Sequence, residues 1–180
     1  NITGPKAHRV TFRQTCSNAM LANAVGPELL KHGKRWYFLT ADYAFGTDAH
    51  ERFKKILLAH GGAEIGNDLH PLAQTDYSSY LTKARNTDAD VLVLCNSGLD
   101  AANTAKQWVD FGLNKKMHLT GISLEDIYYK ALPLDAVVGA TFPVLWAPSV
   151  SPGAAKLAKR LGAAIPGPIG GRHYLGYMSA

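Results

Sequence analysis

Four short segments of this sequence combine aromatic and polar side chains, and each follows a run of apolar residues. The segments cover positions 41–46, 96–99, 121–126 and 146–151. They contain the candidate ligand-binding residues Tyr43, Phe45, Asn96, Ser97, Ser123, Glu125, Asp126 and Trp146. Apolar walls with a few orienting polar groups are what a small amphipathic ligand needs. Taken singly, Asn96 and Ser97 are also ordinary turn residues, so it is the clustering that predicts a binding site.

Motifs for catalysis are missing from the sequence. The segment that ends at Gly46 has one glycine where a dinucleotide-binding loop has three, and neither a P-loop nor a G-x-S-x-G elbow occurs. Glu125 and Asp126 could form an acid/base pair, although adjacent acids near a helix start more often interact with the helix dipole. The seven histidines stand singly, without metal-ligand spacing. The sequence therefore predicts a non-catalytic binding protein with no metal and no cofactor.

Composition and charge fit this interpretation. The chain of 180 residues is 47% hydrophobic and 18% charged, which is ordinary for a globular protein. A net charge of +5 raises the question of nucleic-acid binding, but the basic residues are dispersed and no basic patch alternates with aromatic residues. We therefore expect no nucleic-acid partner. Cys16 and Cys95 could pair as in secreted proteins, but Cys95 ends a run that resembles a buried strand, which favours two free thiols.

Strand-like and helix-like patterns alternate along the middle of the chain and would position the four segments. The expected strands are 36–40, 63–69, 91–95, 117–120 and 138–145, and the expected helices are 47–60, 77–87, 100–111 and 124–131. This alternation predicts an α/β fold with a doubly wound parallel sheet. Ligands of such sheets bind beyond the carboxyl ends of the strands, which would bring the four segments to one edge.

The two ends of the chain depart from this alternation. A strand over 9–15 and a helix over 20–31 are expected first, with Gly26 and Pro27 weakening the helix. Proline residues near position 148 predict a linker, which is followed by a helix over 154–161 and a glycine- and proline-rich loop. No signal peptide opens the sequence, and it stops within a helix-like pattern. These features suggest a part of a longer protein.

Several segments together resemble one known family. Leu39–Gly46 is similar to the strand, polar residue, aromatic residue and glycine of type I periplasmic solute-binding proteins. The nearest group is the leucine/isoleucine/valine-binding class of ABC-transporter receptors. Weaker similarities follow in order at Val10–Arg13, Asp76–Tyr80, Ala89–Leu94 and Gly139–Ala140. The resemblance extends over nearly the whole chain.

The resemblance implies two α/β lobes that close on a small-molecule ligand by hinge motion. Residues 1–19 would then be a part of lobe 1 with the first crossover, 20–147 would be lobe 2, and 148–180 would be the second crossover and an incomplete return to lobe 1. It also implies a periplasmic location and an ABC permease as partner. A chain with one complete wall of the cleft is expected to bind weakly alone and to self-associate through its open surface.

The resemblance also assigns roles to individual residues. Phe45 matches the aromatic residue that packs on the ligand, and Trp146 lies at the second crossover. Asn96 and Ser97 match a loop that supplies an aromatic residue in many relatives and does not here. Ser123 lies nearest the acidic position that pairs with a ligand ammonium group, just before Glu125 and Asp126.

Because Ser123 stands nearest the position at which relatives have an acidic residue, an amino acid, a carboxylic or aromatic acid and an amide all stay open as ligands. A cytoplasmic amide-sensing domain of the same fold, and a sugar- or nucleotide-modifying enzyme, stay open as alternative functions.

Overall fold

The computed structural model describes residues 7–124, 128 and 132–179. They form two compact units, one of residues 18–143 and one of residues 1–17 with 144–180. These limits lie near the lobe boundaries expected from the sequence, and the assignment of the units to lobes stays a prediction. Each unit is described by itself below. No helix among the described residues is long and apolar enough to cross a membrane.

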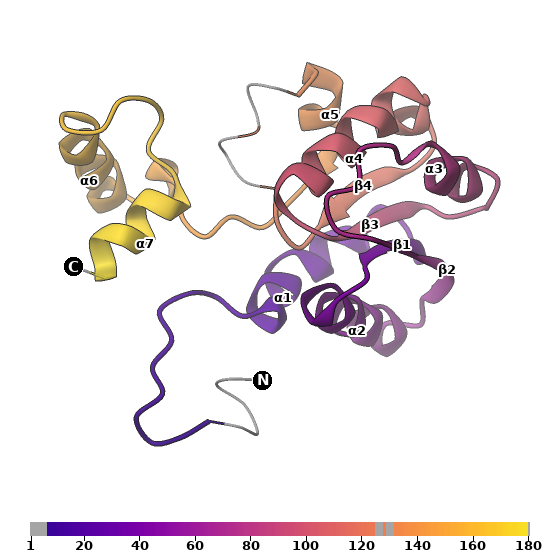
Figure 1. Cartoon of the computed structure of the whole chain (residues 1–180), viewed down its shortest axis with the longest axis horizontal. Coiled ribbons are helices and arrows are strands. Elements are labelled where there is room, and N and C mark those ends of the chain that lie inside the picture. The colour runs from indigo at the N-terminus through magenta and orange to yellow at the C-terminus, as the bar shows by residue number, and fades with distance from the viewer. Residues whose placement is uncertain (1–6, 125–127, 129–131, 180) are drawn as a thin grey trace. The chain divides into compact units, whose positions relative to one another are not determined.

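The larger unit is built on a parallel sheet (Figure 1). Its strands are β1 (Arg35–Ala41), β2 (Ala63–His70), β3 (Val91–Cys95), β4 (His118–Gly121) and β5 (Ala140–Thr141). They are hydrogen-bonded in the order β2-β1-β3-β4-β5, and every neighbouring pair is parallel. The connecting helices are α1 (Asn18–Leu29), α2 (Ala44–Ala59), α3 (Ser78–Arg85), α4 (Gly98–Asp110) and α5 (Leu134–Val138). The predicted doubly wound α/β fold is confirmed.

Each face of the sheet carries its own hydrophobic core, because successive strand side chains point to opposite faces. Trp36 and Phe38 of β1 pack with α1 and α2, whereas Tyr37 and Leu39 pack with α3 and α4. The strand β3 is buried along its whole length. The sequence of a strand that is covered on both faces is a continuous apolar run. The limits of β3 were predicted correctly for this reason.

Of the expected strands, one is much shorter than predicted and another does not form. The stretch predicted as a strand over 138–145 starts inside a helix, since Val138 ends α5 and only Ala140–Thr141 form β5. Short apolar runs with adjacent β-branched residues do not distinguish helix from strand by periodicity. The expected strand 9–15 is irregular in the structure, with Phe12 90% exposed. Most of the helix expected over 124–131 lies outside the described residues.

The first helix passes through the Gly26–Pro27 pair and ends at Leu29. A Cβ at position 26 would lie 2.9 Å from the Ile56 Cδ1 atom of α2, so a larger residue there would require the Ile56 side chain to shift. The two helices therefore approach closely over this residue, and α1 and α2 pack as neighbours on one face of the sheet. Tertiary packing thus outweighs the local cost of proline.

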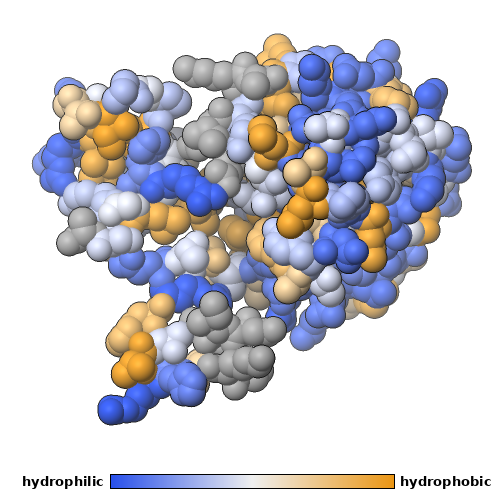
Figure 2. All heavy atoms as spheres, in the orientation of Figure 1, coloured by the Kyte–Doolittle hydropathy of each residue, from blue (hydrophilic) through white to orange (hydrophobic). Residues whose placement is uncertain are grey.

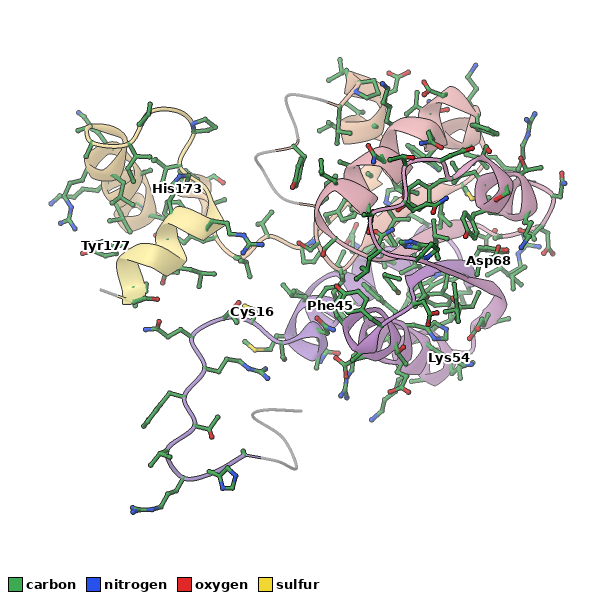
Figure 3. The ribbon with its side chains drawn as sticks, viewed as in Figure 1. Cys16, Phe45, Lys54, Asp68, His173 and Tyr177 are labelled. Carbon is green, nitrogen blue, oxygen red and sulfur yellow. The ribbon has the colours of Figure 1, made fainter. Side chains whose placement is uncertain are left out.

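The smaller unit contains the helices α6 (Pro152–Gly162) and α7 (Gly171–Ser179). The Ser151 hydroxyl caps α6 by accepting a hydrogen bond from the Ala154 backbone N–H at 3.1 Å. Between the helices lies an open hollow of about 480 Å³, and Figure 3 labels two of its lining residues, His173 and Tyr177. The Trp146 ring stacks on Tyr174 with centroids 5.3 Å apart. The Gln14 amide donates to the Met178 carbonyl oxygen at 2.8 Å, so the N-terminal segment contacts α7.

Candidate functional site

The strand order creates a crevice position at the carboxyl ends of β1 and β3. The chain runs from β1 outward to β2 and then returns past β1 to β3. Helix α2, which follows β1, covers one face, and α4, which follows β3, covers the other. The two connections therefore leave neighbouring strands in opposite directions. Ligands of doubly wound sheets bind at such a switch point.

Gly46 anchors helix α2 at this edge. A Cβ at this position would lie 2.1 Å from the Ala41 carbonyl oxygen and 2.9 Å from the Cys95 carbonyl oxygen. No side chain can occupy that space, so only glycine lets the first turn of α2 rest on the ends of both strands. This close approach positions Phe45 beside the switch point. The helix begins earlier than expected, at Ala44, so Phe45 lies in its first turn and not in a loop.

Tyr43 and Phe45 form an aromatic pair at the carboxyl edge. Their ring centroids are 5.7 Å apart and the ring planes differ by 26°. Tyr43 is 38% exposed, whereas Phe45 is partly buried against the core beneath α2. The Asn18 side-chain amide donates to the Phe45 carbonyl oxygen at 3.2 Å and so fixes this turn from α1. Phe45 lies at the start of α2, and Lys54 lies further along the same helix (Figure 3).

Asn96 and His70 form a buried pair where β3 and β2 end. The Asn96 Nδ2 and His70 Nε2 atoms are 3.0 Å apart, and His70 Nδ1 lies 2.8 Å from the Pro71 carbonyl oxygen. Asn96 is 1% exposed and His70 is fully buried. The Asn96 Oδ1 atom is buried and makes no hydrogen bond to the described residues. The Asn96 side chain is therefore packed inside the protein and does not lie on an open loop.

Asp100 and Tyr77 extend this buried polar group. The carboxylate of Asp100, in the first turn of α4, accepts a hydrogen bond from the Ala73 backbone N–H at 3.3 Å. Ala73 itself has φ of 59°, an unusual conformation for a residue with a side chain. The Tyr77 ring meets His70 edge-on at 5.2 Å. Burial, with the Asp100 carboxylate as second cause, raises the pKa of the Tyr77 hydroxyl.

The sequence analysis missed His70, Tyr77 and Asp100 as members of this edge. A single histidine at the end of a strand is a weak signal, because its burial depends on which neighbours the fold supplies. Asp100 was assigned to a helix by pattern, and an acid in a first turn is ordinary there. The sequence signal that could have identified His70 was its position, because it directly precedes the loop after β2 and so lies at the carboxyl edge of the sheet.

The remaining predicted site residues fall in three places. Ser97 precedes α4 at the same edge as Asn96, and its side chain makes no capping hydrogen bond. Ser123 is partly buried after β4. Trp146 belongs to the smaller unit. Glu125 and Asp126 lie outside the described residues. Within the larger unit, Tyr43 and Phe45 follow the end of β1, and Asn96 and Ser97 follow the end of β3.

Neither a metal site nor a disulfide contributes to this edge in the described part of the chain. No group of three or more histidine, cysteine or acidic residues there could hold a metal ion. Both cysteines are free, and Cys95 is buried at the end of β3. Burial raises the pKa of the Cys95 thiol, so this thiol stays protonated and behaves as a small apolar side chain.

On the side of the larger unit seen in Figure 2, hydrophilic residues predominate and hydrophobic residues lie between them.

Comparison with known proteins gives one family. The model of the periplasmic binding protein family matches residues 1–180. A solved periplasmic binding protein from Burkholderia mallei is 30% identical with a TM-score of 0.90, over 99% of this chain and 48% of that one. An amino acid ABC transporter substrate-binding protein from Pseudomonas fluorescens Pf-5 is 29% identical with a TM-score of 0.84, over 98% of this chain and 49% of that one. The chain spans about half the length of these relatives.

More distant structures share the fold. A solute-binding protein of an ABC transporter from Rhodopseudomonas palustris BisB5, solved in complex with 3,4-dihydroxybenzoic acid, is 23% identical. Its TM-score is 0.77, over 89% of this chain and 46% of that one. Among curated protein sequences, none matches significantly.

Proposed function

Because the chain belongs to the periplasmic binding protein family, we propose that it is the substrate-binding receptor of an ABC importer. In this function it acts in the periplasm, captures a small polar or amphipathic solute between two lobes, and delivers it to the membrane permease. The two lobes capture the solute by closing around it through a hinge motion. The protein binds and releases its solute without changing it chemically.

The observation that carries the proposal is the aromatic pair of Tyr43 and Phe45 at the switch point. A partly exposed aromatic pair offers a flat apolar wall, and a wall of this kind suits the apolar part of a small solute. The first turn of α2 rests on the ends of both β1 and β3, so the pair is held on a rigid part of the sheet. Rigid placement lowers the entropy cost of binding.

The start of helix α2 at this edge favours an anionic group on the solute. The first turn of α2 contains no acidic residue, and Tyr43 does not cap the helix with a side-chain hydrogen bond, whereas the first turn of α4 carries Asp100. Backbone N–H groups at a helix start are unsatisfied within the helix and carry a partial positive charge. A solute carboxylate would be stabilised there. An amino acid, a carboxylic acid and an aromatic acid all carry one.

An ammonium group on the solute would need an anionic partner, because an unpaired buried cation is costly. Glu125 and Asp126 are the candidates that follow from the sequence. If the solute is an amino acid, Glu125→Gln or Asp126→Asn should weaken its binding. Normal binding by both variants would argue for a solute without an ammonium group.

Calorimetric titration of the protein at its natural length tests the function. The probes are leucine, benzoate, 4-hydroxybenzoate and a small aliphatic amide, one at a time, with thermal unfolding as a second readout. Binding of at least one probe should raise the unfolding temperature in a concentration-dependent way. Failure of all four probes to bind would contradict the proposed range of solutes.

A further inference from the structure

The acidic residues of this chain are confined to one of its two units. The smaller unit, 1–17 with 144–180, has seven of the nineteen lysines and arginines and none of the fourteen aspartates and glutamates. Its formal charge is therefore +7, whereas the larger unit, with twelve cations against fourteen acids, has −2. Chance would place about four of the fourteen acids in the smaller unit, so the asymmetry indicates an anionic partner for this unit.

Three of these cations form one face of helix α6. Lys156, Lys159 and Arg160 are spaced by three and four residues, which places them on the same side of the helix, and all three are exposed. Ala154, on the opposite side, is buried. Lys159 and Arg160 lie in the last turn, where cations also complement the helix dipole. Lys156 lies one turn earlier, so the dipole does not account for the whole basic face.

Tyr177 of α7, labelled in Figure 3, orients one of these cations. The Arg160 Nη2 group donates to the Tyr177 hydroxyl oxygen at 2.7 Å, and the guanidinium carbon lies 5.1 Å from the centre of the tyrosine ring. Both side chains are exposed. Because the hydroxyl oxygen accepts this bond, its own proton can serve an anion, together with the remaining N–H groups of the guanidinium. A planar guanidinium that is held in this way suits the oxygens of a phosphate group.

We propose that the basic face of α6, formed by Lys156, Lys159 and Arg160, is a docking surface for an anionic lipid membrane. The inference rests on the proposed function, in which the receptor delivers its solute to a permease in a membrane. The negative potential of anionic headgroups attracts clustered lysines and arginines. Arg160 and Tyr177 bind the lipid phosphate, and docking holds the receptor close to the permease.

The distribution of charge favours a membrane over an acidic protein surface as the partner. Protein interfaces use complementary patterns of positive and negative charge, because such a pattern fixes the register of the two partners. The smaller unit has cations and no acids in its sequence. It therefore attracts a negative surface without defining a register, which suits lipid headgroups that move in the plane of the membrane.

Vesicle flotation with the protein at its natural length tests the surface. The probes are vesicles of phosphatidylcholine alone and vesicles with about 30% phosphatidylglycerol, each at about 50 and about 500 mM salt. The protein should bind only the anionic vesicles, and high salt should release it, because salt screens exposed charges. Equal binding to both kinds of vesicle overturns the proposal. Absence of binding at low salt also overturns it, and an acidic protein surface then becomes the partner.

Substitutions in α6 test which cations are responsible. The combined variant Lys156→Gln, Lys159→Gln and Arg160→Gln should lower the vesicle partition coefficient by about tenfold or more. Exchange of the same residues for other cations, Lys156→Arg with Lys159→Arg and Arg160→Lys, should retain most of the binding. Thermal unfolding shows which variants are folded. Should the combined glutamine variant fail to fold, Lys156→Gln alone should lower the partition coefficient about threefold.

The matched control removes three charges from the larger unit. It combines Lys55→Gln, Lys106→Gln and Lys115→Gln, which are exposed lysines of that unit. The change in net charge is the same as in the α6 variant, but the partition coefficient should fall by about twofold or less. Equal losses in the two variants overturn the proposal, because net charge and not the basic face of α6 would then govern binding.

Calorimetric titration with leucine and 4-hydroxybenzoate separates this inference from the proposed function. The combined α6 glutamine variant should bind these solutes as the wild type does, because none of its three substitutions lies in the candidate site. Vesicle binding without solute binding would contradict the proposed range of solutes and support the docking surface. Solute binding without vesicle binding would support the receptor function and overturn the docking surface.

Discussion

The two ends of the parallel sheet in the larger unit use their polar side chains in different ways. At the amino end, the Asp90 carboxylate accepts hydrogen bonds from the backbone N–H groups of Lys34 and Arg35 at 3.1 and 3.0 Å. It also pairs with the Arg35 guanidinium at 2.9 Å, and this contact, as the largest cause, lowers the pKa of the Asp90 carboxyl. At the carboxyl end, Asn96 Oδ1 has no partner within the described chain and Tyr43 stays partly exposed.

Under the proposed function, this difference would separate a stabilising end from a binding end. Polar groups that are satisfied within the protein contribute to folding, whereas a buried acceptor without a donor reduces stability. Proteins tolerate such unsatisfied groups mainly where function needs them, because activity and stability compete for the same residues. Changes at the amino end should therefore act on unfolding, and changes at the carboxyl end should act on binding. Four predictions test this contrast, from the largest expected effect to the smallest.

The strongest test is Asp90→Ala at the amino end. The substitution leaves two backbone N–H groups and the Arg35 guanidinium without their acceptor, so the free energy of unfolding should fall by about 3 kcal/mol. Denaturant titration measures it. The control is Asp88→Ala, which removes a surface ion pair of Arg35 in which Asp88 is 66% exposed. It should cost less than about 1 kcal/mol. Equal losses in the two variants would show that Asp90 is an ordinary surface residue.

At the carboxyl end, Phe45→Ala should weaken binding of whichever probe the protein binds by about 1–3 kcal/mol, the value of one large buried side chain. Calorimetric titration of the protein at its natural length gives the change. Leu58→Ala is the matched control, because Leu58 lies on the same helix and is 53% exposed. An unchanged affinity for Phe45→Ala would remove this residue from the site.

Lowering the pH should reduce the stability of the protein through protonation of His118, at the amino end of the sheet. Burial, and next the stacked His32 ring 3.6 Å away, lower the pKa of His118 to about 4. The unfolded chain, with an ordinary histidine pKa of ~6.5, binds this proton more readily than the folded protein. The stability contribution is therefore complete above about pH 6.5 and is lost as the pH falls toward 4. Allowing for solvent screening, we expect a loss of about 1 kcal/mol.

Denaturant titration across this pH range measures the loss. In His118→Gln the slope should be smaller, since glutamine does not titrate. An identical pH profile in the variant would assign the acid sensitivity to other groups.

The smallest expected effect concerns two serines that precede helices. Ser151 caps α6 through a hydrogen bond, whereas Ser97 makes no capping bond to α4. Ser151→Ala should cost about 1 kcal/mol of stability, and Ser97→Ala less than about 0.5 kcal/mol. Thermal unfolding of both variants measures the difference. A larger loss for Ser97→Ala would mean that its hydroxyl stabilises the fold and is not available for a solute.

Much of the fold could be predicted from the sequence because the signals were local. Val91–Cys95 is apolar throughout, and the strand has these limits in the structure. The Leu39–Gly46 segment indicated a family to which the chain belongs. Prediction was wrong at Val138, whose β-branched side chain suits a strand although it ends α5. There the contact of α5 with α4 outweighs the local preference.

The sequence by itself determined the parallel sheet, the two segments that follow β1 and β3 at its carboxyl edge, and the place of Phe45 beside a glycine. These features follow from apolar periodicity and from the missing side chain of Gly46, which lets α2 rest on the strand ends. The tertiary structure alone decided that His70 and Asn96 meet, because they are distant in sequence and only the strand order brings the ends of β2 and β3 to one edge. It also decided which of their polar atoms stays unpaired, since burial is a property of the assembled layers and not of any local segment.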